Sequence, residues 1–99
     1  MLYPDLPPIH PGEQLREEFI LPLGLTVEGV AKDIGVPAHR VQALIDKSAV
    51  LSGDLALRLA RYFGTTPEFW LNLQRDYELQ QAVIQSGAEI LSTVSPRAA

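Results

Sequence analysis

The chain has 99 residues, a length that fits one domain, because domains most often contain about 100–150 residues. It is 46% hydrophobic and 20% charged, which is ordinary for a folded protein and too apolar for a disordered one. The absence of cysteine excludes disulfides, thiol nucleophiles and cysteine-based zinc sites, and the net charge of −4 argues against indiscriminate binding of nucleic acid.

The sequence carries no signal for a membrane, a metal or a cofactor. No run approaches the roughly 18 apolar residues that a membrane span needs, and the first residues lack the pattern of a signal peptide. Two histidines, His10 and His39, are too few for a histidine metal site. Paired carboxylates in an apolar run, a glycine-rich phosphate loop and a Ser/His/Asp arrangement are all missing. We therefore expect a soluble cytoplasmic protein that is not an enzyme and needs no cofactor.

The N-terminal part is predicted to be an extended arm followed by a helix. Four of the eight prolines fall within residues 1–11, which favours an extended arm. From Gly12 on, an apolar stripe at i, i+4 and i+5 indicates an amphipathic helix that stops at Pro22. The stripe is formed by Leu15, Phe19 and Ile20. The acidic residues Glu13, Glu17 and Glu18 form either a solvated face or a patch for a partner.

Two short helices are predicted in the middle of the chain. Thr26 is a good N-cap for a helix over residues 27–34, and Gly35 can end it in the left-handed conformation. Pro37 suits the first position of a helix over residues 37–46.

Two further helices complete an all-α prediction with five helices. Ser52 can cap a helix that ends at Gly64, and Thr66 can cap a last long helix over residues 67–86. Trp70 in this last helix is expected to be a core residue and not a ligand platform. Residues 87–99 are predicted to be a tail with one turn at 88–91, which leaves residues 12–86 as the domain.

Residues 27–46 fit a helix-turn-helix unit. Such a unit needs a small residue where its helices cross, a residue tolerant of positive φ in the turn, and buried aliphatic residues after the turn. These positions are filled by Ala31, Gly35, Val36, Val41 and Leu44. The alternative is two core helices of a plain bundle, which has no need of these residues at these offsets.

The second helix of such a unit would present its outward residues to the major groove of DNA. The candidate DNA-contacting residues are Ala38, His39, Arg40, Gln42, Ala43 and Lys47. Gln42 suits bidentate contact with adenine, Arg40 suits guanine or a phosphate, and Lys47 suits a phosphate. His39 could equally be an ordinary surface residue. Three basic residues are balanced by three acids over residues 27–47, so one copy would bind weakly and a dimer is expected.

Apolar residues in excess of a small core also predict a homodimer. They lie in the N-terminal arm and the last helix: Leu2, Leu6, Ile9, Leu79, Val83 and Ile84.

Three segments resemble the HigA family of antitoxins. They are IHPGEQLREEF at 9–19, LPLGLTVEGVAKDIGVPAHRVQALI at 21–45 and ALRLARYFGTTPEFWLNLQRDYEL at 56–79. The resemblance implies a lambda-repressor-like DNA-binding domain with a helix-turn-helix. It also implies a dimeric type II antitoxin, which silences a small basic mRNA-endonuclease toxin and represses its own operon at the operator DNA. The acidic charge of the chain fits a basic partner.

The departures from the family pattern fall on the DNA side. Val27 stands where the family commonly has a phosphate-binding Gln, and Lys47, Ser48 and Ala49 stand where it usually has Gly-Lys-Arg. Two alternatives therefore stay open: an interaction module that neutralises the toxin but has lost DNA binding, or an orphan helix-turn-helix regulator.

Overall fold

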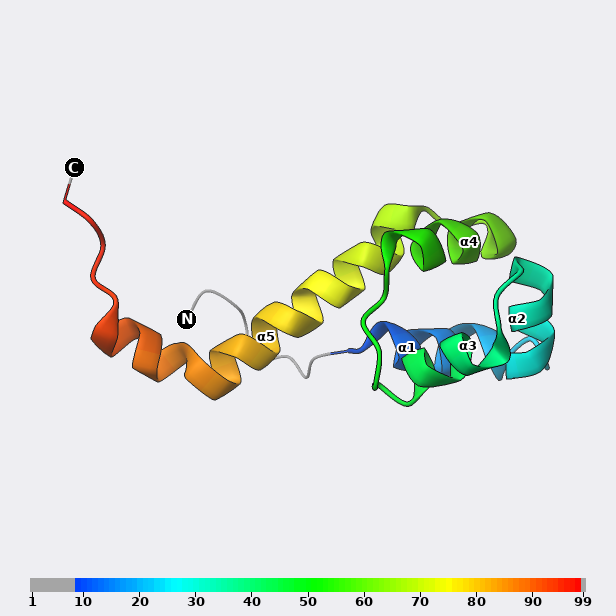
Figure 1. Ribbon diagram of the computed structural model, residues 1–99, viewed down its shortest axis with the longest axis horizontal. Helices are drawn as coiled ribbons and strands as arrows, with labels where there is room; N and C mark the ends of the chain where they lie inside the picture. Colours follow the sequence, from blue (N-terminus) through cyan, green and yellow to red (C-terminus); the bar gives the residue numbers. More distant parts are fainter. Residues whose placement is uncertain (1–8, 99) are drawn as a thin grey trace.

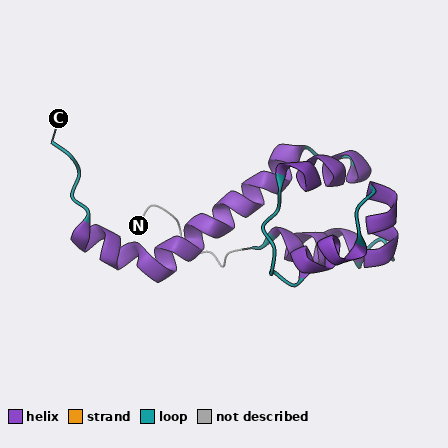
Figure 2. Cartoon of the chain, viewed as in Figure 1, coloured by secondary structure: helices purple, strands orange, loops and turns teal. Residues whose placement is uncertain are grey.

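The computed structural model describes residues 9–98, and these residues form helices and loops without a strand (Figure 2). The helices are α1 (Pro11–Leu15), the π-helical turn η1 (Arg16–Ile20), α2 (Val27–Ile34), α3 (Ala38–Ile45), α4 (Gly53–Phe63) and α5 (Pro67–Thr93). The all-α prediction is confirmed, with the first predicted helix divided into α1 and η1. Leu2 and Leu6, which we expected at a dimer interface, lie outside the described residues.

The first helix begins at Pro11, one residue before the predicted start. His10 is its N-cap, because its Nδ1 accepts a hydrogen bond from the backbone N–H of Gly12 at 2.9 Å. Proline suits the first helical position, where a backbone N–H would have no partner within the helix. In η1 the backbone N–H of Leu21 reaches back five residues to the carbonyl of Arg16 at 3.0 Å.

The helix-turn-helix prediction matches the geometry of α2 and α3. Thr26 caps α2 by accepting from the N–H of Gly29 at 3.0 Å, and Gly35 ends it with φ 77°. Ala31 is only 1% exposed, as a small residue at the helix crossing should be. Pro37 is the N-cap of α3 and not its first residue, because its ψ of 144° is still extended.

The last helix is longer than predicted. The sequence suggested an end near Ser86, but α5 continues to Thr93. Gly87 costs a helix only about 1 kcal/mol relative to alanine, and the following Ala88, Ile90 and Leu91 are compatible with helix, so the glycine does not stop it. The predicted tail thus begins after Thr93.

The core lies between α1, η1, α2, α3 and α4, and the beginning of α5 packs against α4 and α1 at one side of it (Figure 1). Trp70 is fully buried and donates its indole N–H to Oγ1 of Thr65 at 2.7 Å, which confirms its predicted core role. Other fully buried side chains come from each neighbouring helix: Leu15, Val30, Val41, Leu44 and Leu59.

The second half of α5 extends away from this core (Figure 1). It gives the molecule a longest dimension of 52 Å and exposes apolar side chains, among them Ile84, Ile90 and Leu91. Within residues 9–98, no helix combines the length and the apolar character that crossing a membrane requires.

Candidate nucleic-acid interface

Helix α3 has one buried side and one exposed side. Val41 and Leu44 point into the core and are at most 1% exposed. Ala38, His39 and Gln42 are exposed, whereas Arg40 and Ala43 are half-buried at the edges of the helix. The exposed side of α3 therefore brings together part of the predicted DNA-contacting set.

Gln42 is held by a carboxylate on its own helix. Its Nε2 donates a hydrogen bond to Oδ1 of Asp46, one turn later, at 2.9 Å. This bond uses one of the two amide N–H groups and leaves the second N–H and the carbonyl oxygen of Gln42 for another partner. An adenine edge requires one donor and one acceptor, which Gln42 can still supply.

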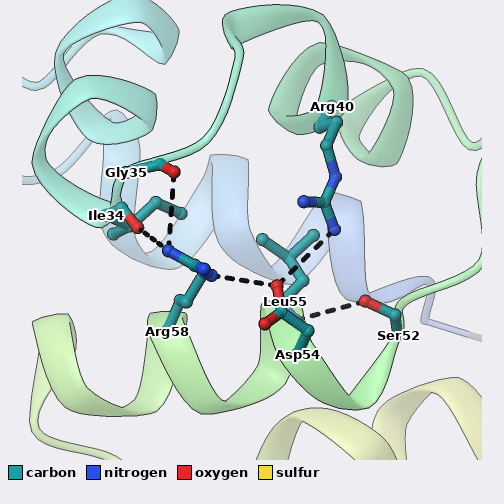
Figure 3. Close-up of polar contacts among 7 residues, drawn as sticks. All are labelled: Ile34, Gly35, Arg40, Ser52, Asp54, Leu55 and Arg58. Carbon is teal, nitrogen blue, oxygen red and sulfur yellow. Dashed lines mark hydrogen bonds and ion pairs between the residues drawn. The ribbon is translucent and has the colours of Figure 1, made fainter.

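The side chain of Arg40 lies toward α4. Its Nη2 is 3.8 Å from Oδ2 of Asp54, in the first turn of α4 (Figure 3). The same Oδ2 accepts a hydrogen bond from Nε of Arg58 at 2.9 Å. Two guanidinium groups thus share one carboxylate oxygen at the seam between α3 and α4.

Arg58 also holds the end of α2. Its Nη1 donates to the carbonyl oxygen of Ile34 at 2.7 Å and approaches that of Gly35 at 3.4 Å (Figure 3). These carbonyls lie in the turn between α2 and α3 and have no partner further along α2. Arg58 therefore fixes the turn of the helix-turn-helix to α4.

A second polar contact ties α2 to α4. The hydroxyl of Tyr62 donates to Oδ2 of Asp33 at 2.7 Å. This hydrogen bond to a carboxylate raises the pKa of Tyr62, because loss of the hydroxyl proton would place two negative groups side by side.

Lys47 lies after α3 and faces α1. Its φ of 62° is left-handed, the conformation in which glycine is most at ease, and the family pattern predicts a glycine here. Its Nζ is 3.7 Å from Oε1 of Glu13. The structure thus pairs Lys47 with Glu13, one of the acidic residues expected to form either a solvated face or a patch for a partner.

His10 has a structural role, although the sequence predicts that it lies on the extended N-terminal arm. It is 3% exposed and makes an edge-on ring contact with Tyr77 of α5 at 4.8 Å between ring centroids. Burial, and secondarily the charge of Lys47, lower the pKa of His10, which keeps Nδ1 free to accept from Gly12.

Two residues that depart from the family pattern, Val27 and Ala49, lie in different parts of the structure. Val27 is half-buried and packs against the core, so this side chain contributes packing instead of a phosphate contact. Ala49 is half-buried in the loop between α3 and α4.

Asp54 and Arg58 do not stand out in the sequence as residues of a DNA-binding site. Their i, i+4 spacing indicates a helical ion pair. Their contacts with Arg40 and with the end of α2, however, depend on how the helices pack.

No protein-family model matches the chain. Antitoxin HigA-1 of Vibrio cholerae is 42% identical over 72 residues, which cover 73% of this chain and 68% of that protein. Virulence-associated protein I of Dichelobacter nodosus is 42% identical over 78 residues, which cover 79% of this chain and 72% of that protein. This chain belongs to the HigA family of antitoxins.

Solved structures support the same family. The Pseudomonas aeruginosa antitoxin HigA, solved with the higBA promoter, matches with a TM-score of 0.88 and 37% identity over 93% of this chain and 100% of that one. The antitoxin GraA in complex with its operator matches with a TM-score of 0.90 and 41% identity over 100% of both chains. The predicted fold class is confirmed, with α2 and α3 as the helix-turn-helix of a HigA-type protein.

Proposed function

We propose that this protein represses its own operon by binding operator DNA through α3, and that it neutralises a toxin encoded beside it. The observation that carries the proposal is the exposed side of α3, held on a turn that Arg58 fixes to α4. Relatives of the same fold have been solved on an operator or promoter. The proposed contact residues are Ala38, His39, Arg40, Gln42, Ala43 and Lys47.

The proposed toxin is a small basic mRNA endonuclease. A net charge of −4 favours association with a basic protein, because complementary charges speed encounter and disfavour wrong partners. In this scheme the protein is a regulator that acts in the cytoplasm by binding, and it performs no reaction of its own.

The proposed assembly is a homodimer that reads two half-sites. Ile84 is 68% exposed and Leu91 is 83% exposed on the part of α5 that leaves the core. Burying such side chains between two copies would stabilise a dimer. A dimer would also make twice as many phosphate contacts as a single copy.

The test is a binding titration on the DNA upstream of the gene and on a scrambled duplex of equal length, each with and without the neighbouring toxin. We expect preference for the upstream duplex, which Gln42→Ala reduces. Asn72→Ala, an exposed position on α5, is the control and should bind as the wild type does. Equal affinity of the wild type for both duplexes, with the toxin present, would contradict the repressor role.

A second candidate is a protein-interaction module that has lost DNA binding. It is favoured by the pairing of cations with acids, since Arg40 and Lys47 lie 3.8 and 3.7 Å from carboxylates of Asp54 and Glu13. Toxin binding measured by calorimetry, together with no preference for the upstream duplex, would support this candidate over the first.

A further inference from the structure

The two arginine partners of Asp54 lie at different distances from its carboxylate. Arg58 is hydrogen-bonded to Oδ2 at 2.9 Å and has further bonds to backbone carbonyls at the end of α2. Arg40 reaches the same oxygen at 3.8 Å, beyond hydrogen-bonding distance. The Arg58 contact is therefore part of the framework, whereas the Arg40 contact is an attraction between charges.

The Arg40 contact is also open to solvent. The side chains of Arg40 and Asp54 are 39% and 57% exposed, and exposed ion pairs contribute little to stability. A phosphate offers a guanidinium the same kind of partner as a carboxylate, with good bidentate geometry. Arg40 lies in the first turn of α3, the part of a recognition helix that approaches DNA.

We propose that Asp54 sets the affinity of this protein for DNA by competing with phosphate for Arg40. In the free protein Arg40 is paired with Asp54; on DNA it exchanges this carboxylate for a backbone phosphate, while Arg58 stays in place. This role rests on the proposed binding of DNA by α3, and it concerns phosphate contact and not the recognition of bases.

The test is a double-mutant cycle with Asp54→Asn and Arg40→Gln. Asparagine removes the charge but keeps an oxygen that can accept from Arg58. Affinity is measured by fluorescence anisotropy on the upstream duplex and on the scrambled duplex, between about 50 and 200 mM salt.

We expect Asp54→Asn to bind both duplexes about two- to five-fold more tightly, since an exposed pair of this kind resists exchange only weakly. Its plot of log affinity against log salt should steepen by up to about 0.9, the slope of one phosphate contact. In the Arg40→Gln background, Asp54→Asn should give a smaller gain and no steepening, because the competing cation is gone.

Asp54→Glu is the charge-matched control and should keep affinity close to that of the wild type. If Asp54→Asn increases the affinity for DNA equally in both backgrounds, the substitution has only removed long-range repulsion between the Asp54 carboxylate and the DNA. That result would overturn the proposal. Weaker binding by Asp54→Asn at an unchanged Tm would show that Asp54 orients Arg40 for DNA, and would overturn it too.

Failure of the proposed repressor role gives a separate result. It appears as equal affinity of the wild type for the upstream and scrambled duplexes with the toxin present, and the cycle on the scrambled duplex still tests Asp54. If neither the wild type nor Asp54→Asn binds any duplex at the lowest salt, both proposals are wrong. Thermal melts of all variants identify any loss of fold that affects these affinities.

Discussion

Gly12 of α1 lies directly against the backbone carbonyl of Leu44 in α3, with no side chain between the two helices. A Cβ built on Gly12 overlaps the Leu44 carbonyl and also comes within 2.9 Å of the α-carbon of Ile45. Helices α1 and α3 are therefore in direct backbone contact at this point. They can approach this closely only with glycine at position 12.

Gly12→Ala is expected to destabilise the protein by about 3 kcal/mol, because backbone on both sides must move to admit a methyl group. In an unconstrained helix the same change stabilises by up to about 1 kcal/mol. Gly53→Ala at the start of α4 is the control, since nothing lies within 4 Å of a Cβ there. Urea unfolding should show opposite signs for the two variants, and equal effects would contradict the contact.

Ala31→Leu should destabilise the protein by about 1–3 kcal/mol, because the larger side chain overpacks the crossing of α2 and α3. Ala82→Leu, at an exposed position on α5, serves as the matched control. For a domain of this size, a loss of 1 kcal/mol lowers Tm by about 4–8 °C. An unchanged Tm for Ala31→Leu would be inconsistent with the tight crossing.

Lys47→Gly should stabilise the fold by about 1 kcal/mol, since glycine adopts the φ of 62° without the strain of a side chain. The lost contact with Glu13 is exposed and contributes little. Lys32→Gly, inside α2, should instead destabilise by about 1 kcal/mol. Chemical unfolding of both variants checks the contrast. If Lys47 binds a phosphate, Lys47→Gly also weakens binding to all duplexes equally.

Stability should fall as the pH drops below about 6.5, the ordinary pKa of histidine. The pKa of His10 is lowered in the folded protein, so the unfolded chain binds the proton first and gains stability relative to the fold. His10→Asn keeps a capping oxygen for Gly12 but does not titrate, and its Tm should change less between pH 7.5 and 5.5. His39→Asn, at an exposed position, should retain the wild-type profile. If the Tm of His10→Asn depends on pH as the wild-type Tm does, His10 is not the cause of the pH dependence.

Gln42→Ala should relax preference at one base pair of each half-site, with a loss of about 1–3 kcal/mol at that position. Asp46→Ala removes the acceptor of the 2.9 Å hydrogen bond from the Gln42 amide, and if that bond orients the amide the variant should show part of the same relaxation. Competition among duplexes with single base changes measures both effects. A uniform loss over all sequences would indicate phosphate contact by Gln42 instead.

The sequence predicted the helices and the turn well, because caps and glycines act locally. Thr26, Gly35 and Ser52 act as the pattern indicated. The predicted end of α5 was wrong because one glycine is a weak stop signal. The position of Arg40 beside Asp54 depends on the packing of α3 on α4, which no local pattern encodes. The buried environment of His10 likewise arises from Tyr77, 67 positions along the chain.

A buried amide on α5 connects the loop after α3 to the long helix. Oε1 of Gln74, which is 7% exposed, accepts from the backbone N–H of Leu51 at 2.9 Å. We expect α5 to unfold together with the core up to about this position, and to open more easily over the residues that extend away from the core. Isolated helical segments of such length are marginal in water. We therefore expect the boundary between the cooperatively folding core and a locally opening segment to lie inside a continuous helix, so that the outer part of α5 can open and close while the core stays folded.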